Sequence, residues 1–155
     1  MDKAMEKANK ILVKEFGKNR KMYMATSYKE MPRVMIKNMC YCEGSFYLVS
    51  METSKLNCDI NHNPKVSICT TASFHKFQGK AHNLGHPLKD ENVQVREILI
   101  SKMKDWYFDN YDETDDSLSL LQIKLECAFV YANKIGYNID FRNNEIESHS
   151  FIPFS

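Results

Sequence analysis

The sequence predicts a mainly β protein with flanking α-helices, organised as one antiparallel barrel. Three observations support this: six or seven segments alternate apolar and polar residues with the period of a strand, most neighbouring segments are joined by hairpin turns, and three segments have helical periodicity. Strands joined by hairpins are antiparallel, and a sheet of this size usually closes on itself to remove its edges. The 155 residues have the length of one domain, so we expect a single domain over residues 1–155.

The first half of the chain is expected to contain two helices and five strands. A helix is expected over about residues 2–18, where apolar residues lie at helical spacing and Gly17 stands at a typical helix end. The apolar residues of this helix are Met5, Ala8, Ile11, Leu12 and Phe16. Strands are expected over residues 22–27, 34–41 and 46–50, with turns at residues 29–32 and 43–44, and then over residues 66–70 and 77–81. Between the third and fourth strands, Thr53-Ser54 predicts the start of a short helix over residues 55–60, which Asn63-Pro64 ends.

The second half is expected to contain one long helix and the remaining strands. The pattern is helical over residues 87–111, as an insertion between strands, and an acidic loop follows over residues 112–116. A long strand is then expected over residues 121–132, followed by strands over residues 135–141 and 146–151. On the long strand one face should carry Leu121, Ile123, Leu125, Cys127, Phe129 and Tyr131.

The charge and hydropathy of the chain exclude several classes of protein. Lys and Arg number 21 against 20 Asp and Glu, so the chain lacks the basic excess of a nucleic-acid-binding domain. No apolar run approaches the roughly 20 residues that span a bilayer, so no membrane partner is expected. The N-terminus is charged and has no signal-peptide stretch, which predicts a cytoplasmic protein.

The five cysteines predict reduced thiols rather than disulfides or a metal site. An odd number of cysteines in a chain without an export signal favours free thiols that pack as small apolar residues. Cys58 and His62 would share a helical face, but two ligands do not make a zinc site. We therefore expect no metal.

The order of several short motifs resembles a known family. The motifs are Met24-Ala25-Thr26-Ser27, Pro32-Arg33-Val34-Met35, Gly44-Ser45-Phe46-Tyr47-Leu48-Val49-Ser50, Thr53-Ser54-Lys55, Asn63-Pro64-Lys65-Val66-Ser67-Ile68, Phe77-Gln78-Gly79-Lys80-Ala81, Trp106-Tyr107 and the strand from Leu121 to Leu125. In this order they resemble the pyridoxamine 5′-phosphate oxidase-like proteins, the FMN-binding split barrels, over residues 23–141. The resemblance implies an antiparallel split barrel and a homodimer that holds FMN at the subunit interface.

Four residues have the chemistry that a flavin phosphate requires. Arg33 offers a bidentate fork, and Lys55 offers a compact charge on the first turn of the short helix. Thr53 and Ser54 lie where free backbone N–H groups favour an anion. The alternative is an ordinary helix cap at Thr53 beside a solvated Lys55; the resemblance favours the phosphate for Lys55 and Arg33.

The resemblance also places residues around the flavin ring. It puts Val34, Met35 and Ile36 on one side of the ring and Leu48, Val49 and Ser50 on the other, with Gln78 reaching toward the cofactor. Gly79 would either allow a close backbone approach or mark a bulge. Trp106 would cover the ring from the partner subunit or, as its apolar stripe favours, pack in the core.

The C-terminal tail departs from the vitamin B6 oxidases. Residues 147–155 contain neither Trp nor Arg, the groups with which those enzymes engage cofactor and substrate, so this substrate is not expected. The sequence predicts an FMN-dependent oxidoreductase for another small molecule, with a nicotinamide as one candidate electron donor. The alternatives are a non-catalytic flavin- or haem-binding module, with His82 or His86 as the haem ligand, and a structural dimer with an empty cleft.

Overall fold

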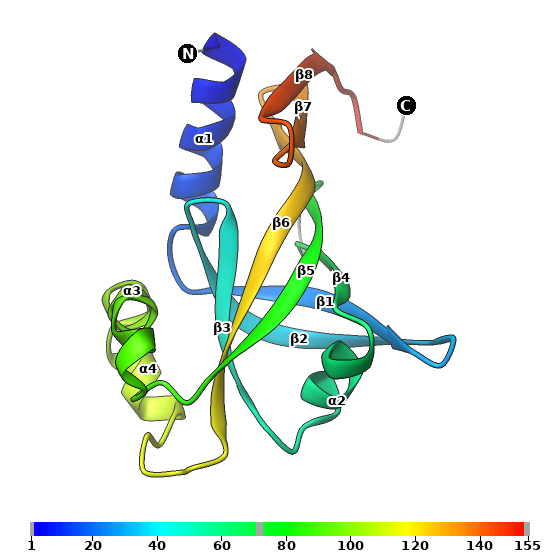
Figure 1. The fold of residues 1–155 in the computed structure, drawn as a ribbon. Helices are drawn as coiled ribbons and strands as arrows, with labels where there is room; N and C mark the ends of the chain where they lie inside the picture. Colours follow the sequence, from blue (N-terminus) through cyan, green and yellow to red (C-terminus); the bar gives the residue numbers. More distant parts are fainter. Residues whose placement is uncertain (1, 71–72, 154–155) are drawn as a thin grey trace.

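The computed structural model describes residues 2–70 and 73–153, and this part of the chain forms eight strands and four α-helices (Figure 1). The helices are α1 (Lys3–Phe16), α2 (Lys55–His62), α3 (Val93–Met103) and α4 (Asp105–Asn110), with a 3-10 turn at Asp90–Asn92 before α3. The strands are β1 (Arg20–Tyr28), β2 (Met31–Cys42), β3 (Ser45–Met51), β4 (Lys65–Cys69), β5 (Lys76–Gly85), β6 (Leu118–Ala132), β7 (Ile135–Asp140) and β8 (Glu145–Ser150). Each of these eight strands overlaps one of the segments that the sequence predicted as a strand, although the count of clearly alternating segments was six or seven.

All eight strands form one antiparallel sheet, which closes into a barrel. The strand order is β3-β2-β1-β4-β5-β6-β7-β8, and an additional pairing of β3 with β6 closes the first six strands on themselves. The predicted antiparallel barrel is confirmed. β6 is 15 residues long, so its first half can pair with β3 while its second half continues beyond the barrel and pairs with β7.

The main core lies inside the barrel and continues under α1. Leu12 and Phe16 of α1 are fully buried, and the Phe16 ring meets Phe46 and Phe77 edge to face, with centroids 5.9 and 5.0 Å apart. Asp2 caps the helix by accepting from the backbone N–H of Ala4. The predicted N-terminal helix is therefore confirmed, with its end at Phe16.

The prediction of one continuous helix over residues 87–111 is wrong. The chain breaks at Lys104, which has a φ of 55°, so two shorter helices form instead of one. The break lets Tyr107 of α4 pack with Leu99 of α3 in a second core cluster. Trp106 is half-buried and packs against the rim of this cluster, which favours the core interpretation of Trp106. The insertion between strands, here β5 and β6, is also confirmed.

The predicted single face of the long strand is wrong beyond Leu125. The pairing register of β5 with β6 shifts between Gln78 and Gly79, and Glu126 is the extra residue on β6. Such a bulge moves all later side chains to the opposite faces. The buried residues are therefore Leu121, Ile123 and Leu125, and then Ala128 and Val130. Cys127, Phe129 and Tyr131 leave the core.

The turn expected over residues 29–32 is shorter than predicted. Tyr28 pairs directly with Met31, so the turn consists of Lys29 and Glu30. Both residues have positive φ, 50° and 64°, as a two-residue hairpin turn requires. β2 therefore begins at Met31 and includes Pro32 and Arg33.

Candidate functional site: the split between β2 and β3

The barrel opens between β2 and β3. These strands pair only through residues 40–42 and 45–47. Before this contact, residues 31–39 of β2 pair with β1 on one side, and no described strand pairs with their other side. Pro32 fits this position because an edge strand tolerates a residue without a backbone N–H. Figure 1 shows β2 running away from β3, with α2 beside the opening, which we call the split.

The predicted ring-contacting residues lie on the two strand edges that border the split. Val34, Met35 and Ile36 lie on the unpaired stretch of β2, and Val49 and Ser50 lie on β3 after its contact with β2 ends. Val34 and Ile36 point outward and are exposed, whereas Val49 is buried in the second core cluster. The strand edges therefore offer backbone N–H and C=O groups to the split, whichever way the side chains point.

The predicted phosphate-binding residues gather at the start of α2. Ser54 is the N-cap: its hydroxyl accepts from the backbone N–H of Asn57 at 3.1 Å and lies 3.0 Å from the Ser50 hydroxyl. The alternative in which Thr53 caps the helix is wrong. Thr53 and Lys55 are exposed on either side of the cap, free to meet an anion that the helix N-terminus attracts.

Arg33 reaches α2 from the other side of the split. Its Nε lies 3.2 Å from Oδ2 of Asp59, which stands one helical turn after Lys55. The Thr26 hydroxyl donates to the same Oδ2 at 2.7 Å. The structure therefore brings Arg33 onto the helix that carries Lys55, as a shared phosphate site requires.

Sequence reasoning missed Asp59 and Thr26. The Asp59 side chain is only 1% exposed, against 33% for Arg33. In the sequence, an Asp four residues after Lys55 has the pattern of a solvated pair along a helix. Only the packing of α2 on β1 buries it, and no local signal in the sequence reports that packing.

Gln78 lies away from the split, on the outer face of the sheet. It pairs with Ser67 on β4, which pairs with Ala25 on β1, which pairs with Val34 on β2. Gln78 and Val34 line opposite sides of an open cavity of about 700 Å³ on this concave face. Within one chain, the structure does not bring Gln78 to the phosphate-binding residues. Its Oε1 instead accepts from the Cys127 thiol at 3.4 Å.

Gly79 serves the barrel rather than a ligand. A Cβ atom on Gly79 would collide with the backbone carbonyl of Lys124 on β6. The residue also stands at the register shift between β5 and β6. Of the two interpretations of Gly79, the bulge is the one that the structure supports.

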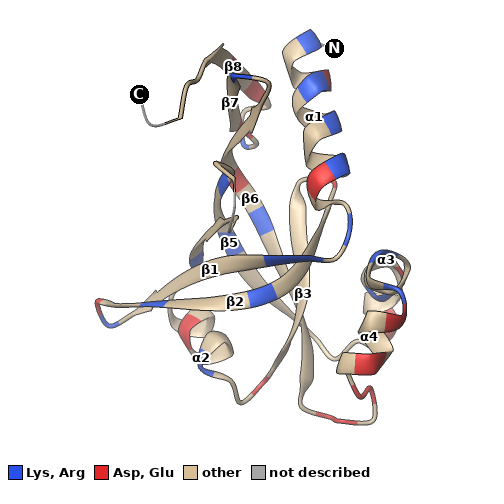
Figure 2. Ribbon diagram, turned by 180° about the vertical axis from the view of Figure 1, so that it is seen from behind, with Lys and Arg blue, Asp and Glu red and all other residues tan. Residues whose placement is uncertain are grey.

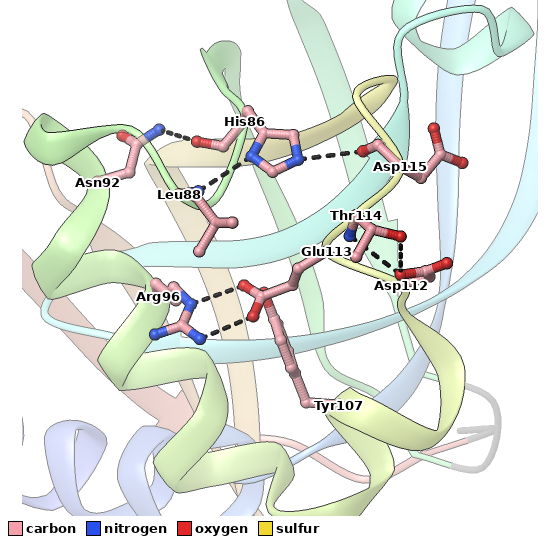
Figure 3. Close-up of polar contacts among 9 residues, drawn as sticks. All are labelled: His86, Leu88, Asn92, Arg96, Tyr107, Asp112, Glu113, Thr114 and Asp115. Atoms are coloured by element: carbon pink, nitrogen blue, oxygen red, sulfur yellow. Dashed lines mark hydrogen bonds and ion pairs between the residues drawn. The ribbon is translucent and has the colours of Figure 1, made fainter.

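His86 holds a loop and has no free ring nitrogen. Its Nδ1 accepts from the backbone N–H of Leu88 at 3.1 Å, and its Nε2 donates to the carbonyl of Asp115 at 3.0 Å (Figure 3). A haem iron at His86 would have to displace one of these bonds. His82 is exposed on β5.

The acidic loop after α4 is fixed by a bidentate ion pair. Nε and Nη2 of Arg96 donate to the two carboxylate oxygens of Glu113 at 2.6 and 2.7 Å, and the Tyr107 hydroxyl donates at 3.1 Å (Figure 3). These hydrogen bonds, above all that of Arg96, lower the pKa of Glu113. Burial raises the pKa of Tyr107. The acidic residues of α4 and its loop gather away from α2 (Figure 2), so they do not oppose an anion at the split.

No protein-family model and no curated protein matches the chain, but solved structures do. A NimC/NimA family protein of Clostridium acetobutylicum is 24% identical and aligns over 95% of this chain and 94% of its own, with a TM-score of 0.58. A pyridoxamine 5′-phosphate oxidase-related, FMN-binding protein of Nostoc punctiforme is 11% identical over 97% of this chain and 93% of its own, with a TM-score of 0.57. A haem-binding protein of Mycobacterium smegmatis is 15% identical over 97% of this chain and 59% of its own, with a TM-score of 0.59.

The longest helix in the described part of the chain has 14 residues, and no helix there could span a bilayer.

The closed six-strand barrel, the unpaired stretch of β2 and the alignment over nearly the whole chain all indicate the same fold. The chain therefore has the split-barrel fold of the pyridoxamine 5′-phosphate oxidase-like, FMN-binding proteins.

Proposed function

We propose that the protein is an FMN-dependent oxidoreductase that acts on a small molecule and holds the flavin in the split. The observation that carries this proposal is the unpaired edge of β2 beside the start of α2, with Arg33 and Lys55 on either side. When bound, FMN supplies the hydride and electron transfer, and the protein supplies position and electrostatics. A reduced nicotinamide is the electron donor that we propose.

The phosphate of FMN would lie at the start of α2. A doubly charged phosphate in a cleft must be compensated, because burying unpaired charge costs several kcal/mol. Lys55 supplies a full charge, since it is exposed and has no ion-pair partner among the described residues. Arg33 shares its charge with Asp59 and contributes directed N–H groups instead. Thr53 and Ser54 add hydroxyl groups at the helix N-terminus.

The polar edge of the flavin ring would pair with strand backbone. In the stretch of Val34, Met35 and Ile36, alternate residues direct their N–H and C=O groups to the open side of β2, where these groups can donate to and accept from the pyrimidine edge. Val49 and Ser50 border the ring from β3. This use of backbone explains how apolar residues such as Val34 and Ile36 would form a site for a polar cofactor.

The exposed outer face supports a homodimer. Val34 and Ile36 on one face of β2 and Tyr23 on β1 are large apolar side chains at the surface. Of these, Val34 and Tyr23 line the concave cavity that Gln78 also lines. An apolar patch beside a cavity is typical of an interface, and two-fold dimers are the commonest oligomers. In such a dimer, Gln78 of one copy would be available to the flavin of the other.

A titration with FMN and riboflavin tests the site, because riboflavin lacks the phosphate. We expect Lys55→Ala to weaken FMN by roughly tenfold to a hundredfold, the cost of about 1.5–3 kcal/mol for losing a charge-assisted hydrogen bond. Riboflavin affinity should change little. Lys14→Ala, an exposed lysine on α1, is the matched control and should affect neither ligand. Equal losses for FMN and riboflavin would contradict the phosphate assignment.

A spectrum of the purified protein separates the proposed function from its alternatives. We expect flavin absorption, with FMN identified by mass spectrometry after release, and bleaching on addition of NADH or NADPH. Flavin that is not bleached by any donor would support the non-catalytic module, and a sharp Soret band would support haem. A colourless protein that takes up neither cofactor would contradict the proposal.

A further inference from the structure

The ion pair of Arg33 and Asp59 is the least satisfied polar contact in the described part of the chain. Within residues 2–70 and 73–153, Nε of Arg33 and Oδ1 of Asp59 are the two buried side-chain polar atoms without a hydrogen bond. The Nε–Oδ2 separation is 3.2 Å, but the N–H is not aligned for a hydrogen bond. Buried polar groups are normally satisfied, so a pair that leaves two atoms unsatisfied needs an explanation.

Asp59 itself is held firmly in place. Its Oδ2 accepts from the Thr26 hydroxyl at 2.7 Å, and its backbone carbonyl accepts from Asn63 at the end of α2. Its carboxylate is almost completely buried, so it requires the positive charge of Arg33 nearby. The guanidinium is therefore drawn to a fixed point between β1, β2 and α2.

The outer end of Arg33 is left available. Neither Nη1 nor Nη2 of Arg33 makes a hydrogen bond with a described residue, and a third of the side chain is exposed. The two Nη groups of an arginine form a planar fork that fits two oxygens of a phosphate. With Nε turned toward Asp59, this fork is the part of the side chain that can face a ligand.

The negative charge of Asp59 also disfavours the binding of an anion close to it. Its negative charge offsets that of Arg33, so by charge alone it weakens the attraction for a phosphate. Orientation and charge thus make opposite predictions for its removal. If Asp59 serves to orient Arg33, neutralising it weakens phosphate binding; if it acts only as a competing charge, neutralising it strengthens binding.

We propose that Asp59 is a positioning residue for the flavin phosphate, which holds Arg33 with its Nη fork toward the split. The inference rests on the proposed function, because it assumes that the split binds FMN. Thr26 acts through Asp59, since its hydroxyl fixes the carboxylate oxygen that faces Arg33.

The test is the ratio of FMN to riboflavin affinity in Asp59→Asn, which has nearly the same shape as the native residue but no charge. We expect FMN to bind about tenfold or more weakly, while riboflavin affinity is unchanged. In an Arg33→Gln background, the same substitution should have little further effect on FMN, because the residue it positions is gone. Thr26→Val should lower FMN affinity in the same direction by a smaller factor, and it provides the test if Asp59→Asn does not fold.

Three results would overturn the inference. Unchanged or tighter FMN binding by Asp59→Asn would assign Asp59 to charge competition, and equal losses for FMN and riboflavin would assign it to the fold. Additive losses from Asp59→Asn and Arg33→Gln would show that Asp59 does not act through Arg33. A native protein that binds neither ligand is a different result, because it would overturn the proposed function itself.

Discussion

At the scale of single residues, the Arg33–Asp59 ion pair complicates the interpretation of FMN binding by a variant at Arg33. Arg33 has two roles in our proposal: it offers N–H groups to a phosphate, and it compensates a carboxylate that is 1% exposed. Removing Arg33 removes both. A loss of FMN binding in Arg33→Ala would therefore mix the phosphate contact with the stability of the fold, whereas Lys55→Ala does not have this ambiguity.

We expect Arg33→Ala to lower the free energy of unfolding by about 3 kcal/mol, the lower end for a broken buried ion pair, because a third of Arg33 is exposed. The loss arises because Asp59 stays buried without a positive partner. Combining Arg33→Ala with Asp59→Asn should recover most of it. Urea denaturation of the two single variants and the double variant measures both effects. A double variant no more stable than Arg33→Ala would show that the loss does not arise from the uncompensated carboxylate.

The Glu113 carboxylate should make stability depend on pH. Hydrogen bonding to Arg96 and Tyr107 holds the pKa of Glu113 below its ordinary value of 4.5. A carboxylate with a lowered folded-state pKa stabilises the fold above its unfolded-state pKa, and the contribution is lost as the pH falls through the folded-state pKa. Glu113→Gln should therefore cost about 1.5–3 kcal/mol at pH 7 and progressively less below pH 4.5. Thermal unfolding of both proteins from pH 7 to pH 3 measures this difference, and a constant difference would contradict the prediction.

At the scale of elements, the bulge in β6 determines which residues reach the outer face. The extra residue Glu126 turns Cys127 and Phe129 out of the core and onto the wall of the concave cavity. Gly79 allows this arrangement, because it lets β5 approach the backbone of β6 more closely than a side chain would permit. The pairing of β5 with β6 in the barrel and the lining of the cavity therefore both depend on the close approach of Gly79 to the backbone of Lys124.

Gly79→Ala should destabilise the protein by roughly 2–3 kcal/mol, within the range for overpacking a tight site. Its new Cβ would collide with the carbonyl of Lys124, and backbone in the middle of a barrel cannot move aside easily. Gly136→Ala on β7 is the control, since its Cβ would meet mainly the outer edge of the Phe129 ring, which can rotate away. Urea denaturation should give the larger loss for Gly79→Ala. Equal losses would show that the contact with β6 is not the cause.

At the scale of the whole molecule, the outer face of β1 and β2 is apolar where a monomer would normally be polar. Val34 is 70% exposed and Ile36 is 54% exposed, on neighbouring positions of the same face. The unpaired edge of β2 lies along the same strand. If a second copy covers this face, it also closes the split from outside, which would join the assembly of the dimer to the formation of the flavin site.

We expect light scattering to give twice the chain mass of 18.1 kDa at micromolar concentration. Ile36→Glu should shift the mass toward that of a single chain, because a buried carboxylate at an apolar interface is unfavourable. Val13→Glu on α1 is the matched control: Val13 is 61% exposed but lies on another surface, so the dimer should persist. A native mass near 18.1 kDa would contradict the homodimer.

The sequence by itself determined the barrel, because its signals are local. Alternation with period two marks the strands, and two-residue turns such as Lys29-Glu30 make successive strands antiparallel. The start of α2 was predictable for the same reason, since a cap depends on a residue and its near neighbours. These signals correctly predicted that Ser54 and Lys55 lie at the start of a helix and that Val34, Met35 and Ile36 lie on a strand.

Only the tertiary structure decided what these elements bring together. The burial of Asp59, its contact with Thr26 and its pairing with Arg33 join three segments, so no local pattern could predict them. The bulge at Glu126 likewise depends on how closely β5 approaches β6 at Gly79. Alternation along a strand indicates two faces, but the pairing register decides which face is buried after each bulge, and that register is a property of the closed barrel.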